Sequence, residues 1–329
     1  MGRTMASRDI ARLNTLRFIS NNKALIILCL GVAIAAILSP AFFTSRNVLN
    51  VLRQICTGAV LSLGFTAIIS SGNLDLSVGY QVGMIGAEMA LLSNAGLPFF
   101  PTILIGMLSG AFCGFVNGII GVTLGLPMLI ITLANGQIFS GITLLITGNS
   151  PVKGLSDGFK AAGQGYFLGF PIPFFILAFM VLLICLIVNK TVFGRHLIAT
   201  GGNKEAAHVS GIDTKKVLVL TYMLMGVCAA VAAVILTGRA MSAQPGGGKG
   251  MERDCVAAVV IGGSSLSGGS AKIVGTVVGC LIVGVINNLL NLLGVDSNWQ
   301  YVAKGLLILV AVGLDVFSTK IIQKSMERV

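Results

Sequence analysis

The chain has 329 residues and a net charge of +11; 55% of its residues are hydrophobic, another 43 are glycine, and only 10% are charged. Soluble domains are about 25% charged. The composition therefore excludes a soluble enzyme or a disordered protein and predicts an all-α integral membrane protein. The basic residues stand between apolar runs, as the positive-inside rule expects, so they do not indicate a nucleic-acid partner.

The membrane-spanning segments are predicted from uncharged runs, because a helix needs about 20 mostly apolar residues to cross a bilayer. Pro98 and Pro101, followed by Gly125-Leu126-Pro127, divide the longest run into separate helices. The predicted spans number about ten, and they lie in residues 24–45, 54–74, 76–87, the divided run 89–152, 161–189, 217–238, 255–266, 273–295 and 299–318.

One membrane domain is predicted over residues 24–318, between an N-terminal segment (1–23) and a tail (319–329) that both lie on the inner side. The N-terminal segment is basic along its length, and Pro40 stands where a signal peptide would be cleaved. We therefore expect the first apolar run to be a retained helix.

Residues 255–266 are apolar but short, and they cover only roughly 18 Å of a ~30 Å hydrocarbon core. They can form a half-helix that continues the glycine-rich stretch before them, or a re-entrant segment. If they cross, more than twice as many Lys and Arg lie inside as outside, whereas the numbers are equal if they do not. The positive-inside rule favours crossing.

Ten spans divide into two halves of five, and an odd number of spans gives the halves opposite orientations, as in many transporters. The fourth and ninth spans each carry two glycines four residues apart and then an asparagine: Gly110, Gly114 and Asn117, and Gly275, Gly279 and Asn287. This spacing lets helix backbones approach closely. In a chain so rich in glycine the match is weak, so the inverted repeat is predicted mainly from the number of spans.

Charged groups at membrane depth are costly and usually functional, and the candidates are Arg53, Asp75, Glu88, Lys304 and Asp315. Arg53 and Asp315 stand near span ends, where a charged side chain can reach the membrane surface. Asp75 either has such a role or caps the third span, with Ser77 as the alternative cap. Glu88 lies about 20 Å further along the helix, so it is predicted deep in the bilayer, facing a partner or water. Lys304 and Arg53 are the candidate partners.

Amide side chains interrupt two predicted spans, with Asn135 and Gln137 in the fifth and Asn287, Asn288 and Asn291 in the ninth. Amides at this depth either bond neighbouring helices or line a hydrated path. The chain has one Trp and four Tyr, which leaves little aromatic surface for stacking on a solute. Tight recognition of a solute is therefore expected to lie elsewhere.

No catalytic residue, cofactor or metal site is predicted. The seven cysteines lie mostly in apolar runs without C-x-x-C spacing, as small buried hydrophobic residues do. Gly263 and Gly268 have the spacing of a phosphate loop, but Gly269 stands where that loop needs Lys. We find no Ser/His/Asp set and no paired carboxylates.

The longest predicted inner loop spans residues 189–216. A Glu-Ala-Ala sequence between two glycine breaks predicts a short helix on the inner face, which suits the docking of a soluble partner; a solvated connector is the alternative. The residues of this docking segment are Gly201, Gly202, Asn203, Glu205, Ala206, Ala207 and Gly211.

Four motifs are recognisable together: Asp75-Leu76-Ser77-Val78-Gly79, the Gly201–Gly211 loop, the stretch from Ala243-Gln244-Pro245 to Gly268-Gly269, and residues 287–295. With these motifs the chain resembles the permease subunits of ribose-type sugar ABC transporters, in a wider family that includes branched-chain amino-acid permeases. The resemblance runs from Leu38 to about Asp315.

This resemblance implies a ten-helix permease that carries a pentose or hexose across a bacterial inner membrane, with both termini cytoplasmic and lipid around it. It implies a cytoplasmic ATP-binding subunit that docks on the Gly201–Gly211 loop, a periplasmic solute-binding protein, and a second permease subunit, identical or paralogous. ATP hydrolysis would then occur in the partner, and this chain would not be an enzyme.

The sequence departs from the family pattern at three points. Asn73-Leu74 precedes Asp75 where the family usually has Gly-Ile, Glu252-Arg253-Asp254-Cys255 stands in place of Glu-Leu-Asp-Ala, and Glu88 is not part of the pattern. Two alternatives remain open. One is a permease of the same family for a non-sugar polar solute, and the other is a secondary carrier coupled to an ion through Glu88.

Overall fold

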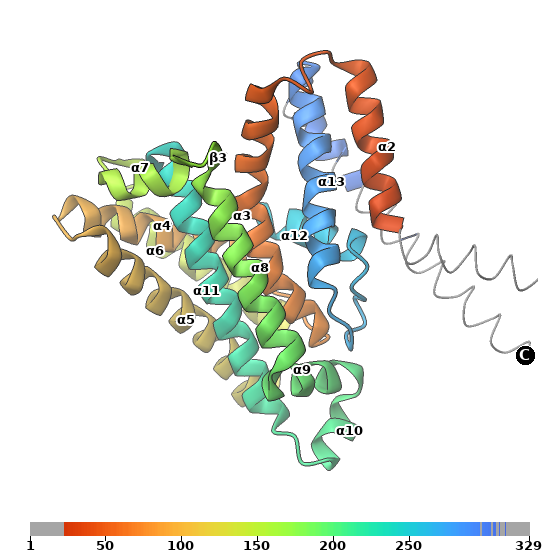
Figure 1. Cartoon of the computed structure of the whole chain (residues 1–329). Helices are drawn as coiled ribbons and strands as arrows, with labels where there is room; N and C mark the ends of the chain where they lie inside the picture. Colours follow the sequence, from red (N-terminus) through yellow and green to blue (C-terminus); the bar gives the residue numbers. More distant parts are fainter. Residues whose placement is uncertain (1–22, 297, 304, 307–308, 310–312, 314–329) are drawn as a thin grey trace, which may run out of the picture.

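The structure is a computed structural model that describes residues 23–296, 298–303, 305, 306, 309 and 313. The predicted N-terminal segment up to Asn22, Lys304 and Asp315 of the predicted last span, and the tail 319–329 lie outside the described residues. The described part is a bundle of helices with two small two-stranded sheets (Figure 1).

The elements follow one another as α2 (Lys23–Leu38), α3 (Ser45–Ser70), α4 (Val78–Asn94), α5 (Phe99–Leu124), α6 (Met128–Thr147), β1 (Val152–Lys153), α7 (Asp157–Gln164), β2 (Tyr166–Phe167), β3 (Phe170–Pro171), α8 (Ile172–Lys190), α9 (Val192–Gly202), α10 (Lys204–Val209), α11 (Thr214–Ala240), β4 (Ser242–Ala243), α12 (Met251–Ile261) and α13 (Ile273–Leu292). Among the described helices, six are long and apolar enough to cross a membrane: α3, α5, α6, α8, α11 and α13. The apolar α2 and the helices α4 and α12 are shorter, with 16, 17 and 11 residues.

The predicted breaks within residues 89–152 are confirmed at Pro98 and at Gly125-Leu126-Pro127, whereas Pro101 lies in the first turn of α5. Pro98 is the N-cap of α5. The first N–H groups of a helix have no hydrogen-bond partner within it, so the N–H that proline lacks is not needed there. α5 ends at Gly125, whose φ of 64° is easily reached by glycine. Pro127 then precedes the first residue of α6. The long uncharged run thus contains two helices of membrane length.

α3 begins at Ser45, well before the predicted residue 54, because Thr44 caps it: the Thr44 hydroxyl accepts a hydrogen bond from the Asn47 N–H at 3.4 Å. The helix therefore includes Arg53, which the prediction had placed at a boundary. The guanidinium carbon of Arg53 lies 4.9 Å from the ring centre of Tyr166. A guanidinium group over an aromatic ring is stabilised by a cation–π interaction. The charge of Arg53 is therefore accommodated within α3.

Three further predicted elements have wrong bounds. The span predicted to run from 24 to 45 ends at Leu38, and α3 begins at Ser45. The span predicted from residue 161 begins only at Ile172, because β2 and β3 form a hairpin that turns through Leu168 and Gly169, both with positive φ. The predicted loop 189–216 contains α9 as well as the expected short helix. Thr191 caps α9 by accepting a hydrogen bond from Gly194, and Leu197 is fully buried. The sequence did not predict α9, because a single buried apolar residue on a short segment does not produce a long apolar run.

α11 lies at the centre of the bundle and contacts α3, α4, α5, α7 and α9 (Figure 1). Its approach to α5 is close because glycines face it. A Cβ atom on Gly114 would overlap the carbonyl oxygen of Tyr222, and one on Gly110 would overlap that of Gly226. The first predicted pair of glycines is thus a helix-packing site.

The second pair of glycines packs α13 against α12. A Cβ atom on Gly279 would overlap the carbonyl oxygen of Ala258, and one on Gly275 would overlap that of Gly262. α12 therefore lies directly on α13 and also contacts α3. The close helix contact predicted from both glycine pairs is confirmed.

The chain between α11 and α13 passes from one end of the bundle to the other. It starts at β4, where Ala243 pairs with Val152, and Gly248 then packs against Gly79 near the start of α4. α12 continues into a turn in which the Gly269 N–H donates to the Ser70 carbonyl at 2.9 Å, at the opposite end of α3. This geometry agrees with the half-helix alternative for residues 255–266.

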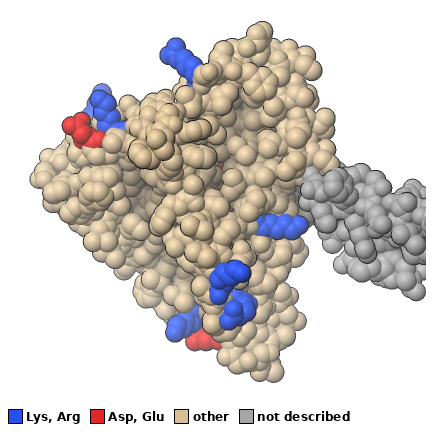
Figure 2. Space-filling view, viewed as in Figure 1, with Lys and Arg blue, Asp and Glu red and all other residues tan. Residues whose placement is uncertain are grey.

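Figure 2 shows that Lys and Arg side chains gather mainly toward the two ends of the visible face, with a broad, largely uncharged surface between them. Large apolar side chains are exposed on the helices, for example Leu104, Leu108 and Phe112 on α5. Such a surface is unsuited to water and suited to lipid. Together with the six long apolar helices, this makes the chain a multi-pass membrane protein.

Candidate functional site

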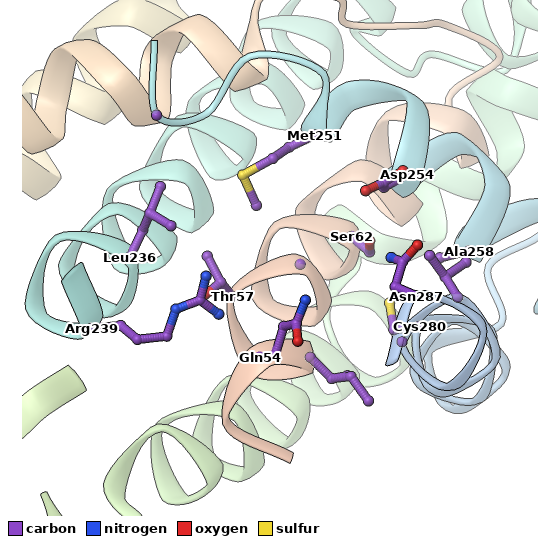
Figure 3. A pocket seen from close by; sticks show the side chains of 15 residues that line it. Gln54, Thr57, Ser62, Leu236, Arg239, Met251, Asp254, Ala258, Cys280 and Asn287 are labelled. Carbon is purple, nitrogen blue, oxygen red and sulfur yellow. The ribbon is translucent and has the colours of Figure 1, made fainter. Parts of the chain in front are cut away.

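A polar cavity of about 230 Å³ lies between α3, α11, α13 and the start of α12 (Figure 3). Its polar lining consists of Gln54, Thr57, Ser62, Arg239, Asp254 and Asn287. A water molecule occupies about 30 Å³ in the liquid, so the cavity holds roughly seven waters or one small solute. Among the predicted candidates that the structure describes, Asn287 alone lines this cavity.

Two polar atoms at this cavity have no hydrogen-bond partner among the described residues. They are the hydroxyl oxygen of Thr57, a residue that is 2% exposed, and the amide oxygen of Asn287. A buried polar atom without a partner costs about 1–3 kcal/mol. The two orphaned atoms therefore favour a hydrogen-bonding molecule in the cavity.

A second polar group is a buried network around Ser77. Its hydroxyl donates to the Asp75 carboxylate at 2.6 Å and accepts from the side-chain N–H groups of Gln81 and Asn117, each at 2.8 Å. Asn117 in turn accepts from Asn135 at 2.7 Å. The structure thus brings the candidates Asp75, Ser77 and Asn135 together through a residue that the sequence had marked only for its spacing.

The capping predictions for Asp75 and Ser77 are corrected in one respect. Ser77 occupies the N-cap position of α4, but its side chain makes no capping bond. Asp75 instead accepts from both the backbone N–H and the hydroxyl of Ser77. The extended segment before α4 is also held by Tyr222, whose hydroxyl donates to the Leu74 carbonyl at 2.9 Å. The network therefore joins α4, α5, α6 and α11, and its geometry indicates a structural role.

Replacing Ser77 with Ala is expected to lower the free energy of unfolding by about 2–6 kcal/mol, because two buried amide N–H groups lose their acceptor at about 1–3 kcal/mol each. The midpoint of thermal unfolding of the purified chain in detergent measures this. Thr123→Ala is the control, since the exposed Thr123 hydroxyl bonds only to its own helix. Equal midpoints for the two variants would contradict the proposed role of the network.

Glu88 is half-buried on α4, and its Oε1 atom accepts a hydrogen bond from the Ser109 hydroxyl on α5 at 2.8 Å. The partner predicted as Arg53 is corrected, since Arg53 lies over the ring of Tyr166. The other predicted partner, Lys304, lies outside the described residues. Sequence alone missed Ser109 because a neutral hydroxyl gives no charge signal.

Glu88→Leu is expected to reduce solute uptake about threefold or more, because the charge-assisted hydrogen bond between α4 and α5 is worth about 1.5–3 kcal/mol. Initial uptake rates at equal membrane abundance measure the effect. Glu88→Gln keeps an acceptor for Ser109 and is expected to retain more of the rate than Glu88→Leu. A Leu variant with normal uptake and assembly would make Glu88 an incidental charge.

The remaining amide candidates lie apart. Asn288 exchanges two hydrogen bonds with Asn47 of α3, at 3.0 and 2.8 Å, and so joins α13 to α3. Asn291 is exposed and accepts from Gln300 at 2.8 Å. Gln137 is exposed on the outer face of α6. Asn288 has the predicted interhelical role, whereas Gln137 and Asn291 border neither the cavity nor the Ser77 network.

The predicted docking segment consists of the last two residues of α9, Gly201 and Gly202, and a short helix, α10, at the end of the bundle away from α7 (Figure 1). Asn203 caps it by accepting from the Ala206 N–H at 2.9 Å, Ala207 is buried, and Glu205 is exposed in the first turn. The chain then leaves the helix through Gly211, whose φ is 85°. An exposed carboxylate on a capped, anchored helix is available to a partner.

Glycines connect this segment to the rest of the bundle. A Cβ atom on Gly201 would overlap the Ser70 carbonyl at the end of α3, and it would lie 2.9 Å from the Gly269 nitrogen. Gly202 lies beside Gly269 as well. The end of α9, the end of α3 and the turn between α12 and α13 thus meet in backbone contact.

A further cavity of about 560 Å³ lies at the same end, lined in part by Asn73, Thr200, Gly201, Lys204 and Lys215. It brings the docking segment next to the loop before Asp75. The polar residues that sequence missed at the polar cavity are Gln54, Thr57, Ser62, Arg239 and Asp254. Gln54, Thr57 and Arg239 stand at the ends of apolar runs, where a polar residue is ordinary.

A polar cavity of solute size inside a bundle of membrane-length helices is typical of a membrane transport protein. A family model described as the permease component of the branched-chain amino acid transport system matches residues 47–312. The chain belongs to this family of permeases.

Three curated relatives are similar over most of their length. The ribose import permease protein RbsC of Bacillus subtilis (strain 168) is 43% identical, over 86% of this chain and 89% of its own. RbsC of Escherichia coli (strain K12) is 38% identical, over 92% and 95%. The D-allose transport system permease protein AlsC of the same strain is 38% identical, over 89% and 91%. No solved structure matches the chain.

Proposed function

We propose that this chain is the membrane-spanning permease subunit of a binding-protein-dependent ABC importer that carries a monosaccharide, a ribose-like pentose or a hexose. The observation that carries this is the similarity, over nearly the whole chain, to permeases named for ribose and allose. The cavity supports it, because its hydroxyl, amide, carboxylate and guanidinium groups are those that hydrogen-bond a sugar.

The chain works with three partners: a cytoplasmic ATP-binding subunit, a periplasmic solute-binding protein and a second permease subunit, identical or paralogous. ATP is hydrolysed in the partner. The scarcity of aromatic residues noted above fits recognition by the binding protein. ATP binding favours one of two states of the assembly, and this difference in affinity supplies the work of transport.

Coupling runs through α10, with Gly201, Gly202, Asn203, Glu205, Ala206, Ala207 and Gly211 as its segment. Closure of the ATP-binding subunit moves α10, and the glycine contacts with Ser70 and Gly269 pass that movement to α3, α12 and α13. Because these contacts are between backbones, no side chain can bend to absorb the movement. This argument supports a direct mechanical path from the docking helix to the cavity.

The full chain spans a bacterial inner membrane about ten times, in two inverted halves of five helices, with both termini in the cytoplasm. Six long described helices and the shorter α2, α4 and α12 support this count. The path of the chain from β4 through α12 to Gly269 supports counting that segment as one crossing.

Reconstitution tests the proposal. The purified chain is placed in proteoliposomes with or without the ATP-binding subunit and the binding protein, and uptake of labelled ribose and allose is measured. Uptake is expected only with ATP and both partners. Uptake by the lone chain under an ion gradient would contradict an importer and favour a secondary carrier. ATP-driven uptake of another polar solute, with neither sugar accepted, would contradict the monosaccharide assignment alone.

A further inference from the structure

The start of α12, which borders the polar cavity, carries two exposed basic side chains. Lys249 and Arg253 are exposed, and the Arg253 side chain is 67% accessible although its Nε lies 3.8 Å from Glu252. Neighbouring Gly248 packs on Gly79, near the start of α4, and 17 residues of helix place the start of α4 about 25 Å from its other end. Exposed bases of a membrane protein face water or protein rather than lipid.

A second hollow of about 180 Å³ lies beside these bases, lined by Lys249, Arg253 and Tyr301. Met251 and Asp254 line both this hollow and the polar cavity. The polar cavity therefore adjoins this hollow, whose basic residues suit it to water.

The lining of the polar cavity suits a solute that both donates and accepts hydrogen bonds. Arg239 offers donors and Asp254 offers acceptors, while the amides of Gln54 and Asn287 and the hydroxyls of Thr57 and Ser62 offer both. The unpartnered oxygens of Thr57 and Asn287 accept from hydroxyl groups. None of the described residues that line the cavity is aromatic, so a solute binds there weakly enough to be released.

We propose that this cavity is a station at which one small polyhydroxylated solute is held during passage, with the Thr57 hydroxyl and the Asn287 amide as its hydrogen-bonding groups. The inference rests on the proposed function as a sugar importer. It adds a place and two contact residues within this chain.

Gly58 allows the cavity to be filled without disturbing the fold. It lines the cavity from α3, and a Cβ atom there has no neighbour within 4 Å in the described part of the chain. Gly58→Leu in the full importer is expected to reduce the initial uptake rate at least tenfold at equal membrane abundance. Gly141→Leu on α6 is the matched control, since Gly141 also has no neighbour within 4 Å but does not line the cavity. It is expected to stay within twofold of the natural chain.

Labelling measures occupancy directly. Gly58→Cys, with the cavity-lining Cys280 replaced by Ala, is treated in the full importer with a neutral thiol reagent. The transported sugar, ribose or allose, is expected to slow labelling at least threefold. Adding Thr57→Val and Asn287→Leu is expected to remove that protection while the rate without sugar stays unchanged.

Three results would overturn the inference. Labelling that no transported sugar slows would show that the cavity is not a station, while leaving the importer assignment intact. Normal uptake by Gly58→Leu would show the same. Failure of the complete natural importer to take up either sugar would contradict the monosaccharide assignment first, and this inference with it.

Discussion

Replacing Gly114 with Val is expected to prevent the natural packing of α5 on α11 and to abolish the stable, assembled subunit. A Cβ atom there would overlap the backbone carbonyl of Tyr222, which cannot move without shifting α11. Overpacking usually costs about 1–3 kcal/mol, and displacement of a central helix costs more than that. The fraction of the purified chain that elutes as a single species in detergent, and its midpoint of thermal unfolding, measure the loss.

Gly141→Val on α6 is the matched control for this substitution, because a Cβ atom at Gly141 meets nothing within 4 Å. Both changes add the same side chain to the interior of a membrane-length helix, so they differ only in what the new atoms meet. If both variants kept the natural midpoint, the close α5–α11 contact would not be the source of stability that we infer.

Glu205→Arg is expected to lower ATP-driven uptake at least tenfold while the chain still inserts and folds. Glu205 is exposed in the first turn of α10, where its charge also matches the positive end of the helix dipole. Reversal of that charge leaves the buried anchor Ala207 in place but opposes docking to a partner that receives a carboxylate. Uptake and ATP hydrolysis by the reconstituted importer are measured together.

Two controls separate docking from charge and from folding. Glu205→Gln removes the charge without reversing it and is expected to keep part of the uptake. Lys160→Glu makes a charge reversal of the same size on α7, at the opposite end of the bundle, and is expected to be neutral. Full uptake by Glu205→Arg would refute a docking role for α10.

The helix boundaries that sequence predicted well are those set by local chemistry. Pro98 and Pro127 precede helices, and Gly125 takes the positive φ that ends α5. Asn203 caps α10 through its own side chain. Each of these effects acts within a few residues, so it can be read without knowing where the rest of the chain lies.

The sequence indicated which polar residues are candidates for a site, but it did not indicate which of them bond to one another. Asp75, Ser77 and Asn135 were candidates, yet their connection through Asn117 depends on three helices meeting at one depth. Glu88 was expected to have a charged partner and instead accepts from Ser109. The Arg53–Tyr166 contact, likewise, forms because the hairpin before α8 lies beside α3.

Composition and the length of the apolar runs by themselves determined that this chain lies in a membrane as helices. A chain with so few charged residues and so many apolar ones can place its apolar surface favourably only in lipid. Only the tertiary structure decided which polar side chains share a cavity and which glycines bear a backbone contact. Such contacts join residues far apart in the chain, and their geometry depends on how closely the helices pack.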